Sequence, residues 1–165
     1  MPNVTRGDRP GGLMVYLAGP GRANEHTDPP LVAGDAAMLA WHSDAELNRD
    51  AALQIARHLD APRRVFDVDV PGGHVWHCSL SLRAEEGQLT DQQWAAIAGD
   101  FVDRMGFGDE DGTKAGCRWV AVRHGVSTNG NDHIHLVVNL VREDGTKASV
   151  FNDYLRAQHA AREMR

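Results

Sequence analysis

Residues 133–141 read HIHLVVNLV, and the alternation in this stretch decides the class of fold. Successive side chains of a β-strand point to opposite faces of its sheet. One face of this strand is therefore apolar, and the other carries His133, His135 and Asn139. The pattern predicts a strand that packs a core on one face and leaves the other face polar.

Two upstream segments show strand patterns of the same kind. The segment 74–82 places His77, Ser79 and Ser81 on the face opposite its apolar side chains. The apolar run 118–124 closes on a histidine. These strands are expected to join residues 133–141 in one sheet.

Helical patterns lie between and after the strands. Capping boxes at Ser43 and Thr90 each precede apolar residues at helical spacing, and a last helix is expected from about Asn152 to the C-terminus. The apolar island 13–18 suits a short helix or a short strand equally well. We predict an α+β, two-layer domain: a central, mainly antiparallel sheet with helices on one face and an open, polar face where the chemistry takes place.

The composition indicates one domain over residues 1–165, and the unpunctuated, Arg-rich end suggests the N-terminal part of a longer protein. A net charge of −6 weighs against a non-specific duplex binder, which needs a basic surface. A local basic groove that includes Arg22 and Arg123 is the expected source of phosphate contacts. The chain has neither the ~20-residue apolar run of a membrane span nor a signal peptide, so we expect a cytoplasmic protein.

The sharpest chemical feature is the pair His133 and His135. Residues at i and i+2 on a strand share a face, so both imidazoles can reach one ion above the sheet. His124 closes the preceding strand, and the loop after it returns the chain directly beside it. We predict a three-histidine site with open coordination positions, a pattern that suits a divalent metal.

This region resembles a known family. Residues 123–124 and 131–139 are similar to the third motif of relaxases in the HUH endonuclease superfamily, the MobA-like mobilisation-protein branch. In that family a first histidine, a short loop and an H-x-H pair build the metal site. An aspartate usually stands two residues after the first histidine, and Val126 occupies that position here. The resemblance implies a bound divalent ion, Mg²⁺ or Mn²⁺, with Zn²⁺ as an alternative.

Two more segments extend the likeness. Residues 77–82 resemble the second motif, which implies that Ser81 and Ser79 contact phosphate or base near a nick. Residues 12–21 resemble the first motif, an apolar segment with a tyrosine just before a glycine-containing turn, and here that tyrosine is Tyr16. The order of the three motifs matches that of the family.

The resemblance implies a mechanism. Tyr16 would attack a phosphate of single-stranded DNA, leaving a 5′-phosphotyrosine and a free 3′-hydroxyl. Because tyrosine has an ordinary pKa near ~10, it needs help with deprotonation, and His77 is a candidate for that role. His26 is an alternative nucleophile, through a phosphoramidate. Asn139 is expected to fix a ligand or the local backbone by hydrogen bonding.

The implied function is nicking of the transfer origin of a conjugative or mobilisable element. The implied partners are single-stranded DNA, accessory relaxosome proteins that bind DNA, and a coupling protein. A two-histidine phosphoesterase acting on RNA ends or cyclic nucleotides is the main alternative, although only residues 77–79 supply its H-x-[S/T] pattern. A zinc hydrolase, which would need an H-E-x-x-H motif that the chain lacks, and a replication-initiator-like module that binds single strands are the others.

Overall fold

The computed structural model describes residues 2–18, 31–42, 47–109, 114–126 and 131–164, with backbone alone for 124–126. Within these ranges the chain forms five strands, five α-helices and a short 3-10 turn. In chain order they are β1 (Asn3–Gly7), α1 (Pro10–Ala18), β2 (Leu31–Gly34), α2 (Ala36–His42), α3 (Arg49–Phe66), β3 (Val75–Ser81), the 3-10 turn (Ala84–Glu86), α4 (Asp91–Arg104), β4 (Trp119–Val126), β5 (Asp132–Asn139) and α5 (Asp153–Glu163).

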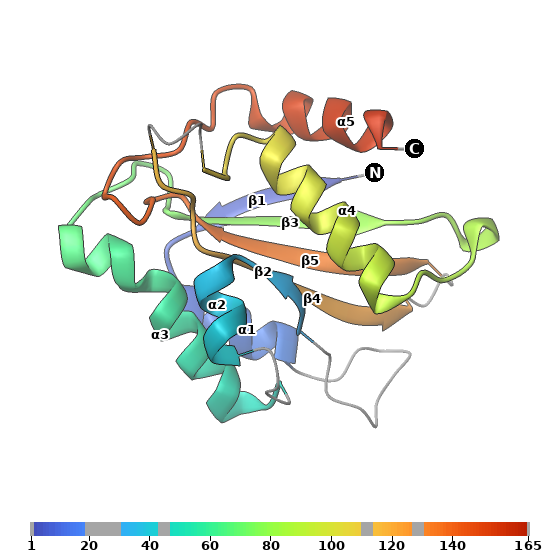
Figure 1. The fold of residues 1–165 in the computed structure, drawn as a ribbon, viewed down its shortest axis with the longest axis horizontal. Coiled ribbons are helices and arrows are strands. Elements are labelled where there is room, and N and C mark those ends of the chain that lie inside the picture. The colour runs from blue at the N-terminus through green and yellow to red at the C-terminus, as the bar shows by residue number, and fades with distance from the viewer. Residues whose placement is uncertain (1, 19–30, 43–46, 110–113, 127–130, 165) are drawn as a thin grey trace.

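The strands form one antiparallel sheet in the order β1-β3-β5-β4-β2 (Figure 1). Its centre is the β3–β5 pair, which runs in continuous register from Val75 opposite Asn139 to Ser81 opposite His133. β4 and β5 are neighbours, as expected of two strands joined by a short loop. The α+β class and the mainly antiparallel sheet predicted from the alternation are therefore confirmed.

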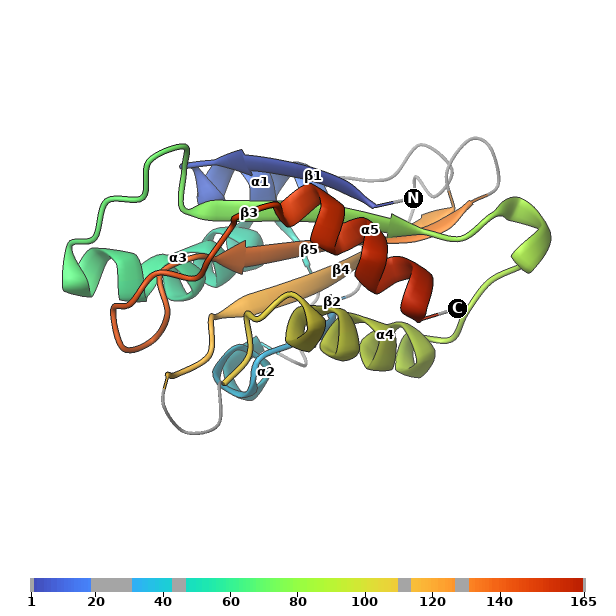
Figure 2. The ribbon, with the colours of Figure 1, turned by 90° about the horizontal axis from the view of Figure 1, so that it is seen from above.

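One face of the sheet packs against α4 and α5 (Figure 2). Trp76 and Cys78 of β3 lie fully buried here beside Leu136 of β5. Trp94 and Phe101 of α4 complete the same core. This apolar layer holds the backbone of β3 and β5 in place, and the side chains that alternate with it point to the opposite face.

Helices also cover part of the second face. Val75, Val120, Val122 and Val137 form a second core with buried side chains of α1, α2 and α3. In Figure 2, α1 and α3 lie across the sheet from α4 and α5. The open polar region is thus restricted to the part of this face that α1 and α3 leave uncovered.

Helix starts follow local capping chemistry. The predicted capping box of α4 is confirmed: the Thr90 hydroxyl accepts from the Gln93 N–H, and the Gln93 side chain accepts from the Thr90 N–H. α3 begins later than predicted, because the side chain of Asn48 caps it by accepting from the Ala51 N–H. The box at Ser43 lies outside the described residues.

Four elements went unpredicted, and all are short: β1, β2, α2 and the 3-10 turn. β1 and β2 are the edge strands of the sheet: β1 has a single apolar side chain, and β2, at four residues, is too short for a clear alternation. α2 starts after Asp35, whose carboxylate accepts from the N–H groups of Ala37 and Met38, an N-cap that the sequence contained. The island 13–18, left open as helix or strand, belongs to α1.

Candidate active site

The register of β3 and β5 gathers histidines and serines on the second sheet face. Ser79 lies opposite His135, and Ser81 lies opposite His133, so two hydroxyls and two imidazoles form a compact square. All four residues are half-buried, whereas the residues between them on the two strands are buried. We call these four residues and His77 the histidine–serine patch.

His77 connects His135 to β1. Its Nε2 atom lies 2.9 Å from Nδ1 of His135, and its Nδ1 atom lies 3.3 Å from the hydroxyl of Thr5. Burial lowers the pKa of His77 below its ordinary value, which favours the neutral ring at neutral pH. A neutral His77 can accept from His135 at one nitrogen and donate to Thr5 at the other.

His133 is oriented by its own strand end. Its Nδ1 atom lies 3.2 Å from the carbonyl oxygen of Asn131. A carbonyl only accepts, so Nδ1 carries the hydrogen of this bond. The ring is thereby fixed in a tautomer whose Nε2 atom has the lone pair that a metal ligand needs.

The two imidazoles of β5 suit a shared metal ion. Their ring centres are 5.2 Å apart and nearly perpendicular to each other. A metal–nitrogen distance of about 2.1 Å places the ring centres of two ligands about 5 Å apart, so the spacing fits. The Nδ1 atom of each ring is engaged in a hydrogen bond, which leaves the Nε2 atoms as the nitrogens that a metal would bind.

The backbone of His124 lies beside this pair. β4 and β5 are in register at Arg123 opposite Ile134 and again at Val126 opposite Asp132, with one extra residue on β4 between these pairs. Such a bulge is common next to active sites, where it redirects a side chain. Residues 124 and 125 therefore face His133, as the predicted hairpin requires, while the side chain of His124 lies outside the described part.

No group of three or more His, Cys, Asp and Glu side chains that could hold a metal occurs among the residues that the structure describes. Of the three histidines predicted to bind a metal, only His133 and His135 have described side chains. With nitrogen donors alone, it suits a transition metal ion directly, and Mg²⁺ only where water and substrate oxygens complete its shell.

Tyr16 lies on α1, and its side chain is 70% exposed. Its neighbours Met14 and Leu17 are fully buried against the second sheet face, so α1 is firmly anchored there. Leu13, three residues before Tyr16, lines a small cavity of about 300 Å³ together with His77 and Thr5. Residues three apart share a helix face, which places Tyr16 on the next turn beyond this cavity.

Arg123 and Asn139 both have structural hydrogen bonds or ion pairs away from the histidines. Arg123 lies on the opposite sheet face, in ion pairs with Asp91 at 2.8 Å and Asp132 at 3.1 Å. It braces β4 against α4, and the expectation that it also contacts DNA stays a prediction. Asn139 is buried at the far end of β5, where it donates to the carbonyl of Leu59 and accepts from the N–H of Val141. It supports the backbone; no hydrogen bond described here joins it to a histidine.

Arg22 and His26 lie outside the described residues. Sequence reasoning also missed two supporting residues of the site. Thr5 is one, on the unpredicted strand β1. Asp132 is the other: its fully buried carboxylate accepts from the N–H of Leu89 and from the indole of Trp94. The sequence could have indicated Asp132, because it is next to His133 on the strand. Strand alternation therefore points its carboxylate into the core.

Comparison with known proteins decides the family. Residues 44–165, well over half of the chain, match the family described as Relaxase: MobA/VirD2-like, nuclease domain. The chain belongs to this family. The matched part of this relaxase includes the whole histidine–serine patch and His124, whereas Tyr16 and His26 precede it. Searches of curated proteins and of solved structures returned no match.

Membership shows that the chain contains a relaxase-type nuclease domain. The family predicted from the three motifs is therefore confirmed. None of the helices in the described part of this relaxase is both long and apolar enough to cross a bilayer.

Proposed function

We propose that this relaxase cuts one strand at a specific site in the transfer origin of a conjugative or mobilisable element and stays attached through a phosphotyrosine. The observation that carries this proposal is the pair His133 and His135, oriented through their Nδ1 atoms beside Ser79 and Ser81. Such a cluster on the open part of a sheet combines metal ligands with hydroxyl donors for a phosphate.

In the proposed site, His124, His133 and His135 hold a divalent metal. The ion, when bound, would supply positive charge to the non-bridging oxygens of the scissile phosphate. Mn²⁺ and Mg²⁺ are the proposed physiological ions, with Zn²⁺ as an alternative. Ser79 and Ser81, opposite the two histidines of β5, donate hydrogen bonds to phosphate or base. His77 holds the ring of His135 in the orientation that ligation needs.

Tyr16 is the proposed nucleophile. Its hydroxyl oxygen forms a bond to phosphorus as the bond from phosphorus to the 3′-oxygen breaks, and the leaving oxygen takes up a proton. The step replaces one phosphate ester bond with another, so its energy is kept. A 3′-hydroxyl can therefore attack the phosphotyrosine and rejoin the strand. The exposure of Tyr16 and the anchoring of α1 beside His77 support the assignment. His26 stays the alternative nucleophile.

The proposed substrate is single-stranded DNA at the nick site. Accessory DNA-binding proteins of the relaxosome, which would open the origin, and a coupling protein are the proposed partners. We place the reaction in the cytoplasm of the donor cell. The acidic net charge suggests that specificity depends on local contacts and on these partners rather than on a basic surface.

The test is a nicking assay. The protein is mixed with a labelled single-stranded oligonucleotide that spans the transfer origin of its own element, with Mn²⁺, Mg²⁺ or excess EDTA. We expect a cut strand and a DNA–protein adduct stable to denaturation with either ion, and neither product with EDTA. Cutting at full rate in EDTA would overturn the metal site, and cutting without any adduct would overturn the covalent step.

A further inference from the structure

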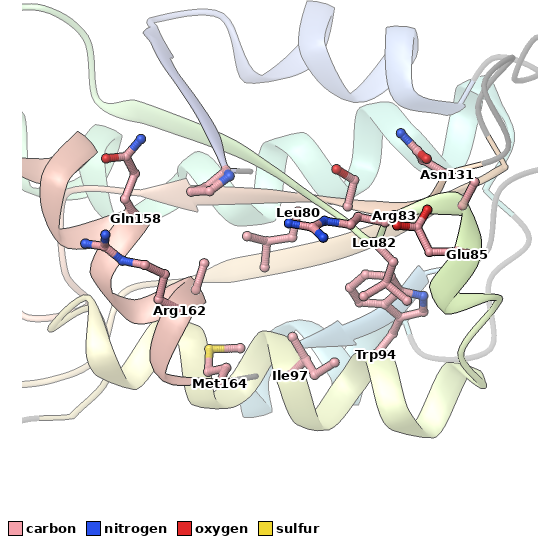
Figure 3. A pocket seen from close by; sticks show the side chains of 14 residues that line it. Leu80, Leu82, Arg83, Glu85, Trp94, Ile97, Asn131, Gln158, Arg162 and Met164 are labelled. Atoms are coloured by element: carbon pink, nitrogen blue, oxygen red, sulfur yellow. The ribbon is translucent and has the colours of Figure 1, made fainter.

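A second hollow lies beside the histidine–serine patch, on the α4–α5 side of the sheet. It is a pocket of about 700 Å³ between α4, α5 and the end of β3 (Figure 3). Its size falls within the range of pockets that enclose a small organic ligand. Neither the family match nor the proposed chemistry assigns it a role.

The pocket walls are largely apolar. Leu80 and Leu82 from the end of β3 face Ile97 of α4 and Met164 after α5, and Trp94 contributes an indole. An open pocket of this kind leaves apolar surface in contact with water, a state that costs free energy unless a ligand covers it. A flat, apolar-faced ligand group would gain from entering.

Polar groups stand at both ends of the pocket. Figure 3 shows Gln158 and Arg162 of α5 at one end, and Arg83, Glu85 and Asn131 at the other. Side-chain amides both donate and accept, so they can read the edge of a base. The two arginines are exposed and form no ion pair within the described part of the chain, while Glu85 disfavours a phosphate inside the pocket.

The pocket lies on the opposite sheet face from the histidines and meets the proposed active site at the ends of β3 and β5. Ser81 lines it and is the register partner of His133. Asn131 lines it too, and the carbonyl of Asn131 orients the His133 ring. A strand whose phosphate lies at the histidines would reach the pocket by turning around the end of the sheet.

We propose that this pocket receives one unstacked nucleobase of the single-stranded DNA, next to the nucleotide that is cut. This inference rests on the proposed function and deepens it. The apolar walls cover the faces of the base, the amides of Gln158 and Asn131 contact its edge, and Arg83 and Arg162 take the phosphates on either side. Such a pocket holds the strand in register over the metal ligands.

The experiment fills the pocket and compares two probes. Both are fluorescent single strands of about 20 nucleotides, long enough for one binding site: one is oligothymidine, and the other has the same phosphates but abasic sugars throughout. Ala161→Trp places an indole in the pocket from α5. Ala96→Trp, on the exposed surface of α4 outside the pocket, is the matched control. Binding is followed by fluorescence anisotropy at fixed salt.

We expect Ala161→Trp to weaken oligothymidine binding roughly 5- to 100-fold, the range for loss of one stacked base, with abasic binding unchanged. Ala96→Trp should change neither. Equal weakening of both probes would overturn the nucleobase assignment, and so would unaltered binding of oligothymidine, the result expected if another segment of the protein occupies the pocket. Thermal melting checks that the variants fold, and Ala161→Leu, a smaller filler, replaces Ala161→Trp if that variant does not.

The two proposals fail in different ways. If the unaltered protein binds and nicks its origin strand while Ala161→Trp binds oligothymidine normally, only the pocket assignment falls. If the unaltered protein binds neither probe and forms no adduct with its origin strand, the proposed function falls and the pocket assignment falls with it.

Discussion

Two parts of the same sheet face behave in opposite ways. In one part, Val75, Val120 and Val137 are buried under α1 and α3. In the other, His133 and His135 stay half-buried beside two serines. The pleat assigns all these side chains to one face, so strand alternation cannot separate them. The helices make the difference, because they cover the valines and end short of the histidines.

The comparison teaches how a small domain combines stability with an accessible site. Each buried valine contributes about 1.5–3 kcal/mol through removal of apolar surface from water, so the covered part holds the sheet to its helices. Imidazoles and hydroxyls gain little free energy from burial, and when half-buried they stay available to bind a ligand. Hydrogen bonds that the histidines of β5 donate to His77 and to the Asn131 carbonyl fix the open part instead.

The largest expected effect is at the open part. The double variant His133→Ala/His135→Ala removes two imidazoles of the proposed metal site, and we expect nicking to fall by at least about 100-fold, since loss of an outer partner alone can cost that much. Mn²⁺ binding by calorimetry should disappear while the circular dichroism spectrum is kept. His159→Ala, an exposed histidine of α5, is the control. Normal nicking by the double variant would contradict the metal site.

The next effect belongs to the covered part. Leu17→Ala creates a cavity under α1, and we expect the free energy of unfolding in urea to fall by about 2–5 kcal/mol. The neighbouring Tyr16→Phe should leave that free energy unchanged, because the Tyr16 side chain is largely exposed. A loss of stability in Tyr16→Phe equal to that in Leu17→Ala would identify Tyr16 as a packing residue.

A smaller effect is expected where the two parts meet. His77→Ala removes the partner of His135, and Mn²⁺ affinity should fall about 10- to 100-fold. Thr5→Val keeps the shape of Thr5 but removes the hydroxyl near His77, and a weaker loss in the same direction should follow. Calorimetric titration measures both. Unchanged affinity in His77→Ala would show that this ring does not position His135.

The smallest effect concerns pH and the helices. Nε2 of His42 in α2 lies 2.8 Å from Nδ1 of His58 in α3, and burial, then the charge of His58, lowers the pKa of His42. The unfolded chain therefore binds more protons below about pH 6.5, and stability should fall as the pH drops from there. Urea unfolding across this range should show a shallower fall in His42→Gln. If the unfolding free energy of His42→Gln fell with pH as steeply as that of the unaltered protein, His42 would not cause the pH dependence.

Much of this site follows from sequence, since alternation alone puts His133 with His135 and Ser79 with Ser81. The register that sets Ser81 opposite His133 did not follow, because it depends on how β3 and β5 align across 51 intervening residues. The ion pair of Arg123 with Asp91 did not follow either, because it joins segments distant in sequence. The sequence also did not predict that helices cover part of the second sheet face. That prediction would have required knowing that residues 13–18 form a helix, and their apolar run fits a helix or a strand.

The central claim is that Tyr16, on the helix beside the histidine–serine patch, becomes joined to DNA. Mass spectrometry of the peptide that stays linked to the origin strand after nicking and protease digestion tests it most directly. The account predicts a phosphodiester to the strand on Tyr16, absent in Tyr16→Phe. Attachment at His26 or at Tyr154, the second tyrosine of the chain, which lies in α5, would contradict it. So would an adduct that persists in Tyr16→Phe.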